Sequence, residues 1–214
     1  MNPKITLVVA CDKNFAIGKD DTLPWKMPSD LKHFKKYTEG KIVVTGMNTF
    51  NSLPHLLENR LMFVMSRNVD AIQVLQAKAD KYRQAKNTDS VPFCAHTTSL
   101  ENFIELIIEY FPHHEEICII GGRQIYDLFL PFADKIVMTM IEAEIDGADT
   151  HFTVPDSKLW KITSTPVRNN KMDVDEYACS IHIFEKVPSA RIISISTKQP
   201  LSKLEVIKLR IDSK

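Results

Sequence analysis

The sequence predicts an α/β fold of three layers: a mostly parallel central sheet with helices on both faces and an antiparallel C-terminal strand. Two observations support this prediction. Short, nearly all-apolar runs alternate with helical patterns through residue 134, and strand-like patterns dominate after that point. Runs with so few polar positions are typical of inner strands covered on both faces. The late run at 176–186 instead alternates apolar with smaller or polar residues, as an antiparallel strand does.

The composition is that of an ordinary globular protein. The chain has 214 residues, of which 44% are hydrophobic and 25% charged, so a sizeable core can form. Lys and Arg number 27, as do Asp and Glu, and the zero net charge gives no argument for nucleic acid or an anionic membrane. The four cysteines are widely spaced without a CxxC or Cys/His cluster, so we expect reduced thiols and no metal.

The first predicted elements surround a long loop. The β-branched run at 5–11 predicts an inner strand, and the stretch at 12–23, which has no clear period, predicts a loop. Pro28 then opens a helix, because proline is tolerated in a first turn, and Asp30 lies where the helix dipole favours an acid. The apolar stripe of this helix consists of Leu31, Phe34 and Thr38.

The middle of the chain repeats the pattern of strand and helix. We expect an inner strand at 41–46, a short helix at 49–53 capped by Asn48, and a third strand at 60–66. The polar and weakly periodic stretch at 70–87 predicts a surface helix.

The clearest helical period begins at Ser99. Apolar residues follow it at spacings of three and four until Pro112 ends the helix. Another helix, at 124–130, follows the pair Gly121-Gly122. The remaining strands are predicted at 91–96, 116–120, 135–141, 159–165 and 176–186.

The chain divides into one domain and an appendage. Residues 1–187 form the α/β domain, in which 69–90 is a helical insertion. Residues 188–214 contain two alternating runs around a Gln-Pro turn, which predicts a β-hairpin. Such a hairpin would extend or cap the sheet; the sharper alternative is a contact surface for a partner or a second copy.

Three strand ends carry groups that suit an anion. Gly46 and Gly121-Gly122 each precede a predicted helix, so that backbone N–H groups can approach phosphate oxygens. A hydroxyl and a guanidinium follow a third strand, at Ser66-Arg67. Each signal alone is weak, since a glycine pair is more often a tight turn, but the three together favour a dinucleotide.

Four side chains have a structural interpretation beside the functional one. On residue type alone, Asp30 is most simply a helix cap and Trp25 a core residue. Thr139 could bond backbone within its own strand, and Arg60 could be an ordinary solvated arginine.

The stretch at 17–38 resembles the dihydrofolate reductase family pattern I-G-x(n)-L-P-W-x-x-P-x-D-L-x-x-F-K-x-x-T. Further matches follow in the family's order, and together they cover about residues 4–187. They are Gly46, Thr49-Phe50, Ser52, Arg60, Ser66-Arg67, Ile120-Gly121-Gly122, Ile125-Tyr126, Thr139 and 149–152. The first motif is specific, and the later matches in the family's order support it.

The resemblance implies a folate site around Asp30. Asp30 would hold the 2-amino group and N3 of the pterin, Thr139 would hydrogen-bond Asp30 and a water, and Trp25 would be the third catalytic residue. Arg60 would pair with the glutamate carboxylate of the substrate, which a guanidinium fork fits. The residues that would wall the ring and the aminobenzoyl group are Val8, Val9, Leu31, Phe34 and Leu53.

The resemblance also implies NADPH as the cofactor. The pyrophosphate would meet Thr49 and Gly122, and the 2′-phosphate would meet Ser66 and Arg67. The nicotinamide would be surrounded by Ala10, Ile17, Gly121, Gly122 and Tyr126. The other residues assigned to the cofactor are Gly18, Gly46, Asn48, Arg123, Gln124 and Ile125.

The implied activity is reduction of 7,8-dihydrofolate to 5,6,7,8-tetrahydrofolate by hydride transfer from nicotinamide C4 to pterin C6, in support of one-carbon and thymidylate metabolism. Two alternatives stay open: a folate-binding structural or assembly protein, and a riboflavin-pathway pyrimidine reductase of the same fold. The Leu-Pro-Trp motif and the lack of a zinc deaminase signature argue against the second. We expect antifolates such as methotrexate as ligands, and a cytoplasmic monomer or homodimer that binds neither nucleic acid nor membrane.

Some positions depart from the family pattern. Met47 stands where the family usually has a basic residue, which leaves Arg67 with more of the 2′-phosphate contact. Arg123 stands where a third glycine is common, and we expect it to help bind phosphate. The short segment at 52–57 resembles that of bacteriophage members, in which case the compartment would be the host cytoplasm.

Overall fold

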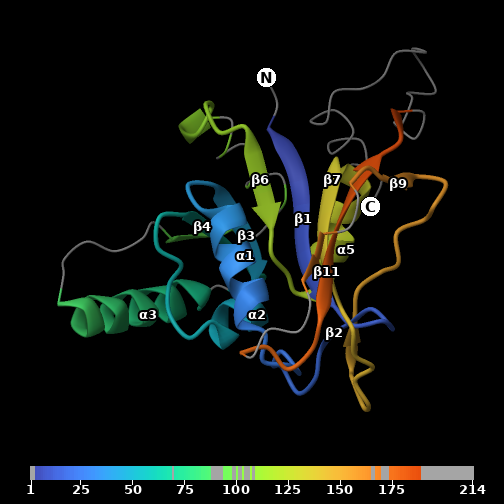
Figure 1. Ribbon diagram of the computed structural model, residues 1–214. Coiled ribbons are helices and arrows are strands. Elements are labelled where there is room, and N and C mark those ends of the chain that lie inside the picture. Colours follow the sequence, from blue (N-terminus) through green and yellow to red (C-terminus); the bar gives the residue numbers. More distant parts are fainter. Residues whose placement is uncertain are drawn as a thin grey trace, which may run out of the picture.

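Nine strands of the described residues form the central sheet of the computed structural model (Figure 1). The structure describes residues 3–68, 70–87, 94–97, 100, 103, 107, 109–164, 167–169 and 174–188. The strands of the sheet are β1 (Lys4–Cys11), β3 (Ile42–Gly46), β4 (Leu61–Met65), β5 (Cys94–Thr97), β6 (Glu116–Ile119), β7 (Lys135–Ile141), β9 (Trp160–Ile162), β10 (Val167–Asn169) and β11 (Cys179–Lys186). Their order is β10-β11-β7-β1-β6-β3-β4-β5, with β9 also paired to β11.

The sheet is parallel except at one edge. β1 pairs in parallel with β6 and β7, β3 pairs in parallel with β4 and β6, and β4 pairs in parallel with β5. β11 runs antiparallel to β7, and both β9 and β10 run antiparallel to β11. The predicted α/β class, with a mostly parallel sheet and an antiparallel C-terminal strand, is confirmed.

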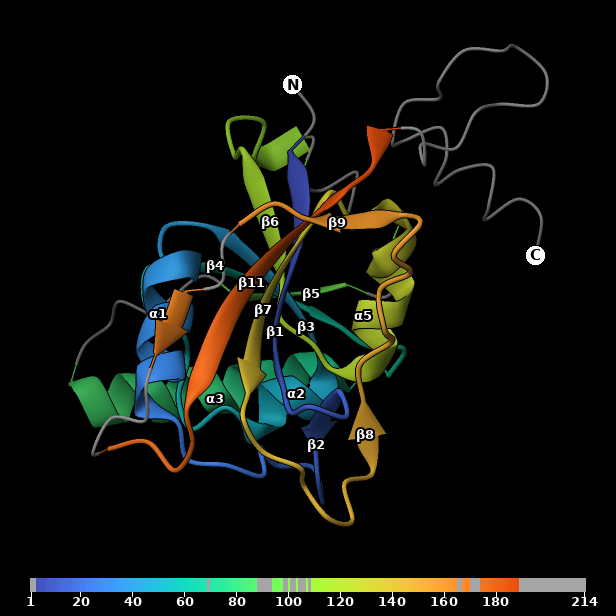
Figure 2. The ribbon, with the colours of Figure 1, turned by 45° about the vertical axis from the view of Figure 1, so that its right-hand side comes forward.

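Helices cover both faces of the sheet, which gives the predicted three layers (Figures 1 and 2). They are α1 (Pro28–Thr38), α2 (Met47–Ser52), α3 (Ala71–Lys86) and α5 (Arg123–Phe129), which leads into the short 3-10 helix η1 (Leu130–Phe132). On the face covered by α1, α2 and α3, Phe50 and Leu75 are buried in one core cluster with the strand residue Val43. On the α5 face, Phe129 is buried in a second cluster with Leu7.

Part of the helix predicted at 99–111 also belongs to the α5 face. Leu100, Phe103 and Ile107 are helical and buried at the predicted spacing. The ring of Phe103 packs edge-on against Phe63 and Phe129, with ring centroids 5.4 and 5.8 Å away. Residues 99, 101, 102, 104–106 and 108 of this predicted helix lie outside the described residues.

The predicted helix cap at Asn48 is wrong. α2 already begins at Met47, with the extended residue Gly46 as its N-cap, and no side chain caps it. Because the chain enters the helix directly from β3, Asn48 lies within the first turn, where it is exposed.

Three short strands in the loops were not predicted, one of which is β10. Within 12–23, β2 (Ala16–Gly18) pairs with β8 (Thr150–His151), and neither is long enough for a periodic pattern to show. The hairpin predicted within 188–214 falls on residues 189–214, outside the described part of the chain, so the division into domain and appendage stays a prediction.

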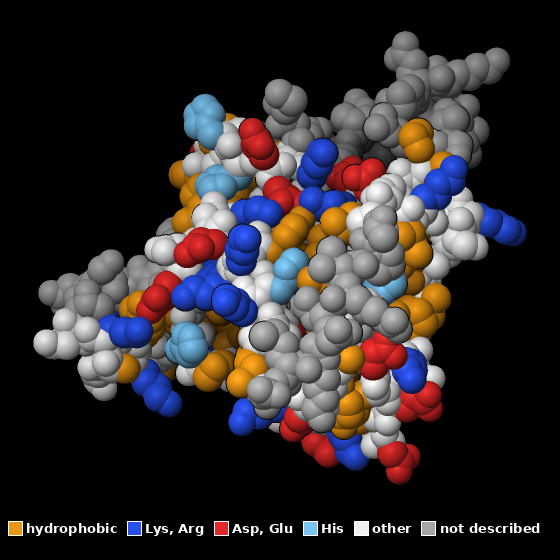
Figure 3. Space-filling view, in the orientation of Figure 1, with side chains coloured by type: hydrophobic (Ala, Val, Ile, Leu, Met, Phe, Trp, Pro, Cys, Tyr) orange, Lys and Arg blue, Asp and Glu red, His pale blue; other side chains and the backbone are white. Residues whose placement is uncertain are grey.

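The face of the molecule drawn in Figure 3 carries charged side chains of both signs. On the face drawn in Figure 3, Lys and Arg side chains lie among Asp and Glu side chains. Among the described residues, no helix combines the length and the apolar character needed to span a bilayer.

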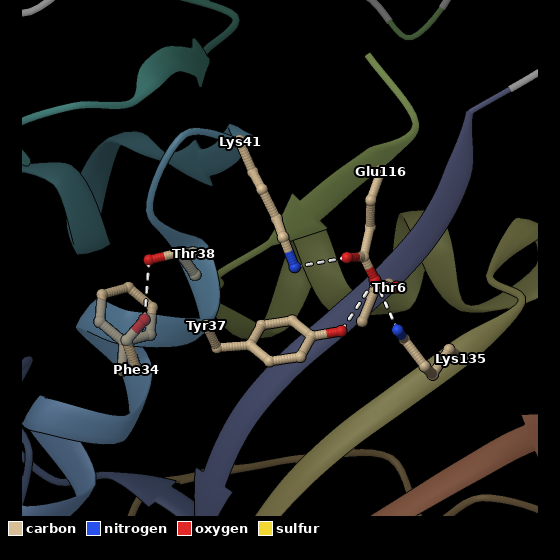
Figure 4. A network of polar contacts seen from close by, with 7 residues as sticks. All are labelled: Thr6, Phe34, Tyr37, Thr38, Lys41, Glu116 and Lys135. Atoms are coloured by element: carbon tan, nitrogen blue, oxygen red, sulfur yellow. Dashed lines mark hydrogen bonds and ion pairs between the residues drawn. The ribbon is translucent and has the colours of Figure 1, made fainter.

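The carboxylate of Glu116 ties α1 to the sheet (Figure 4). It accepts hydrogen bonds from Thr6 Oγ1 at 2.5 Å, Tyr37 Oη at 2.8 Å and Lys135 Nζ at 2.7 Å, and from Lys41 Nζ at 2.5 Å. Tyr37 belongs to α1, whereas the other donors come from β1, β7 and the turn before β3. Burial raises the pKa of Glu116, but the hydrogen bonds, led by those from Lys135 and Lys41, outweigh burial and lower the pKa to about 2.

We expect Glu116→Gln to reduce the free energy of unfolding by about 2 kcal/mol at neutral pH, because the amide keeps the shape but loses the charge that both lysines pair with. Since the pKa of Glu116 is depressed from 4.5 to about 2, this stability is complete above the higher value and is lost as pH falls toward the lower one. Urea unfolding across that window measures the effect. Glu115→Gln makes the same charge change at the exposed neighbour. An equal loss in both variants would contradict the role of Glu116 in tying α1 to the sheet.

Candidate functional site

The site lies where the carboxyl ends of β3 and β6 meet. β3 continues into α2 on one face of the sheet, and β6 continues into α5 on the other, which makes a switch point of the kind at which α/β sheets bind ligands. The N–H of Gly46 and the hydroxyl of Thr45 both donate to the carbonyl oxygen of Gly121, at 2.7 and 2.9 Å. These bonds hold the starts of α2 and α5 together.

Glycines leave room for a ligand between the two helix starts. A Cβ on Gly121 would lie 3.1 Å from the ring of Tyr126, and the φ of +107° at Gly121 is one that L side chains rarely adopt. A Cβ on Gly122 would lie 3.1 Å from Thr49 Oγ1. The bare backbone therefore forms a cradle that side chains would fill, and its N–H groups fit the phosphates of a dinucleotide.

The residues predicted around the nicotinamide lie on β1, on β2, at Gly121-Gly122 just before α5, and on α5 itself. Ala10 is half-buried beside the cluster that contains Trp25, and Ile17 packs against the core on the α5 face. Gly18 ends β2 at its pairing with β8. A Cβ on Gly46 would lie 3.0 Å from Cγ1 of Ile125, so this strand end and α5 are also closely packed.

Four of the residues predicted for the phosphate end are exposed: Asn48, Arg67, Arg123 and Gln124. Ser66 follows β4, and its Oγ accepts the N–H of Asn68 at 3.0 Å. Arg123 does not extend freely toward a phosphate, because its Nε pairs with Asp127 Oδ2 one turn along α5 at 3.1 Å. Arg67 forms no ion pair of this kind within the described part of the chain.

Asp30 is buried in the first turn of α1. Only 9% of its surface is exposed, and the hydroxyl of Thr139, on β7, donates a hydrogen bond to its carboxylate. Burial raises the pKa of Asp30, the Thr139 hydrogen bond and the imidazole of His33 lower it, and the carboxylate of Asp175 raises it; the net shift is upward. The site therefore holds a buried acid whose proton affinity is set by its surroundings.

Trp25 is buried in a cluster with Met27 and Ile141. Its indole Nε1–H is shielded from solvent and has no hydrogen-bond partner among the described residues. A buried donor without a partner is rare in folded proteins. Trp25 is thus a core residue, as its type suggests, that also presents a free donor.

The predicted apolar wall is assembled only in part. Val8, Phe34 and Leu53 belong to one cluster on the α1 and α2 face, and Leu31 beside them is 54% exposed. Val9 is not part of this wall, because neighbouring strand residues point to opposite faces and its side chain is buried on the α5 face. The assignment of the Val9 side chain to the wall is therefore corrected.

Arg60 is buried rather than solvated, with 6% exposure. Its Nε donates to Thr38 Oγ1 at 3.0 Å, and its two terminal nitrogens donate to the carbonyl oxygens of Glu58 and Lys35 at 2.7 and 2.8 Å. No ion pair joins it to an acid in the residues that the structure describes. A fixed guanidinium with no anionic partner, and with donors left over, suits a ligand carboxylate.

Two acids that hold the site together were missed in the sequence. Asp12 is fully buried, and its carboxylate accepts the N–H groups of Asn14, Ala16 and Ile145, each at 2.8 Å. Asp175 accepts two hydrogen bonds from the start of α1. Asp175 acts on backbone 146 residues away, and Asp12 joins its own loop to Ile145, 133 residues away; no local pattern announces these two long-range contacts. Across the described residues, no group of three or more His, Cys, Asp or Glu could hold a metal ion.

Comparison with known proteins agrees with the geometry of the site. A family model described as dihydrofolate reductase matches residues 4–186. The dihydrofolate reductase of Bacillus subtilis (strain 168) is 31% identical over 187 residues, which cover 87% of this chain and 97% of that protein. The dihydrofolate reductase type 3 of Salmonella typhimurium is 36% identical over 175 residues, which cover 82% of this chain and 93% of that protein.

A solved structure has the same fold. It is the dihydrofolate reductase from Enterococcus faecalis complexed with NADP(H) and RAB-propyl, which superimposes with a TM-score of 0.67 at 25% sequence identity. The match covers 86% of this chain and 96% of that one. The family match at residues 4–186 includes both helix starts at the switch point and the α1 segment.

Proposed function

The chain belongs to the dihydrofolate reductase family, and from that premise we propose that Asp30 is the residue that binds the pterin ring. The protein reduces 7,8-dihydrofolate to 5,6,7,8-tetrahydrofolate with NADPH as its cofactor. The observation that carries the proposal is the burial of Asp30, which forms no ion pair with a cation of the described residues; a carboxyl in that position needs donors from a ligand.

Asp30 and its neighbours would orient and polarise the ring. The two carboxylate oxygens of Asp30 accept the 2-amino group and N3–H, while Thr139 holds one of them from the side. The free indole N–H of Trp25 holds a water near this pair. Val8, Phe34 and Leu53 exclude other water from the ring face, and the proton for N5 arrives by way of water rather than from a side chain in contact with N5.

The far end of the substrate would be held by Arg60. Its hydrogen bonds to Thr38 and to two carbonyl oxygens fix the plane of the guanidinium, so little side-chain entropy remains to be lost on binding. The remaining terminal N–H donors then meet the glutamate carboxylate of dihydrofolate as a fork.

The cofactor would occupy the glycine cradle. NADPH supplies the hydride, from nicotinamide C4 to pterin C6. Gly121 and Gly122 leave room for its approach, Thr49 donates to the pyrophosphate, and Ser66 with Arg67 contacts the 2′-phosphate. The remaining proposed contacts are the half-buried Ala10, Ile17 and Ile125, the buried Tyr126, and the backbone at Gly18 and Gly46.

The relatives favour this activity over the two alternatives, because each of those reported above is described as a dihydrofolate reductase. Antifolates such as methotrexate are ligands of the same pocket. Location in the cytoplasm, as a monomer or homodimer that binds neither nucleic acid nor membrane, completes the proposal.

We expect Asp30→Asn to fold but to lose at least about 100-fold in kcat/KM at neutral pH, because the amide can no longer accept from both donors of the ring. The fall in NADPH absorbance with dihydrofolate, with and without methotrexate, measures activity. Asp80→Asn, the same change on the surface helix α3, is the control and should behave as wild type. Near-normal turnover by Asp30→Asn would sink the assignment, and methotrexate binding by a wild-type protein that consumes no NADPH would favour the folate-binding scaffold.

We expect Arg60→Lys to raise KM for dihydrofolate about 10- to 100-fold with a smaller change in kcat, because an ammonium cannot form the fork that holds the carboxylate. Steady-state kinetics with each substrate varied in turn measures this. KM for NADPH serves as the internal control. If both KM values rose together, Arg60 would be a structural residue only, since its loss would then disturb the whole site.

A further inference from the structure

The loop before β11 holds the backbone that leads into Asp30. Asp175 Oδ1 accepts the N–H of Ser29 at 3.0 Å, and Asp175 Oδ2 accepts the hydroxyl of Ser29. The next residue, Glu176, accepts the N–H of Lys26 at 2.8 Å and donates its own N–H to the Lys26 carbonyl oxygen at 3.1 Å. The three residues before Asp30 are thus bracketed by bonds from a loop 146 residues further along the chain.

Asp175 supplies the side-chain acceptor that the start of α1 lacks. The N-cap of α1 is Met27, which has no side-chain acceptor, so the first free N–H groups of the helix need an acceptor from elsewhere. Asp175 is an unusual choice, because it is only 4% exposed and forms no ion pair with a cation of the described residues. A neutral asparagine or serine could accept the same N–H. The charge therefore calls for a separate explanation.

The explanation lies in the adjacent residue. Asp30 follows Ser29 directly, so two buried carboxyl groups share the start of α1. Like charges in a site of low polarity disfavour each other's ionised form. Ser29 donates two hydrogen bonds to Asp175, whereas within the described part of the chain Asp30 receives one, from the hydroxyl of Thr139. Burial is the main reason that the pKa of Asp30 is raised, and the carboxylate of Asp175 raises it further.

We propose that Asp175 is a positioning residue of the reductase: it fixes the first turn of α1 through Ser29, and it places a second buried carboxylate beside the start of the helix that carries Asp30. This inference rests on the proposed role of Asp30 as the pterin-binding acid. It assigns the loop at 174–178 a part in the reaction.

Other groups also face Asp30, and the substitution leaves them in place. His33 lies one turn along α1 and lowers the pKa of Asp30, Thr139 reaches it from β7, and the buried phenol of Tyr126 lies within electrostatic reach from α5. Lys36 acts on His33 but not directly on Asp30. Removal of the Asp175 charge therefore makes ionisation of Asp30 easier, while the other groups that face Asp30 stay the same.

The test uses Asp175→Asn, whose amide oxygen still accepts the Ser29 N–H. Carboxyl carbon NMR of protein labelled with ¹³C-aspartate follows the titration of Asp30, and the Asp30→Asn spectrum identifies its signal. We expect the Asp30 midpoint to move to lower pH in Asp175→Asn, and the matching limb of the kcat/KM profile to move with it. Glu176→Gln removes the same charge from the exposed neighbour and should leave both midpoints where they are in wild type.

An Asp30 midpoint that stays in place or moves to higher pH in Asp175→Asn would overturn the proposal, as would an equal movement in Glu176→Gln. If Asp175→Asn does not fold, Asp175→Ser takes its place with the same expectation, because its hydroxyl can also accept the Ser29 N–H. Failure of the Asp30 assignment is seen separately, as normal turnover by Asp30→Asn. A purely structural role for Asp175 would lower Tm without moving either midpoint.

Discussion

The buried position of one carboxyl group, Asp30, is the constraint on which this structure depends. A buried acid without a cation is costly, and it can serve a ligand only if the helix that carries it cannot shift. α1 is accordingly fixed at both ends by carboxylates from outside it. Glu116 holds the last turn through Tyr37, as Figure 4 shows, and Asp175 holds the first turn through Ser29. The sheet is the common frame, because β6 begins with Glu116 and β11 follows the Asp175 loop.

The pocket contains a second buried charge that is left for the ligand. Arg60 is a buried cation whose hydrogen bonds go to neutral oxygens, so its charge is left for a ligand anion. Glu116, in contrast, is saturated by its two lysines and lies at the opposite ends of the strands from the glycine cradle. Glu116, whose charge is paired with two lysines, stabilises the fold, whereas Arg60, whose charge is not paired in this way, is left to bind the ligand.

The fold could be predicted because inner strands are unbroken apolar runs; the strand expected at 135–141 is β7, Lys135–Ile141, with the same bounds. The motif at 17–38 likewise led to Asp30, and the glycine pairs to the cradle. Contacts between distant backbone segments could not be predicted: Asp175 meets Ser29 across 146 residues, and no period or motif links them. The Val9 error has a different cause, since a family role was carried to a residue whose side chain faces the other side of β1.

The most direct test of the account is the structure of this protein in complex with methotrexate and NADPH. If Asp30 binds the ring, its two carboxylate oxygens will lie about 2.7–3.2 Å from the 2-amino nitrogen and N1 or N3 of the bound heterocycle. A heterocycle seated in the pocket with those nitrogens turned away, so that Asp30 meets only water, would contradict the central claim.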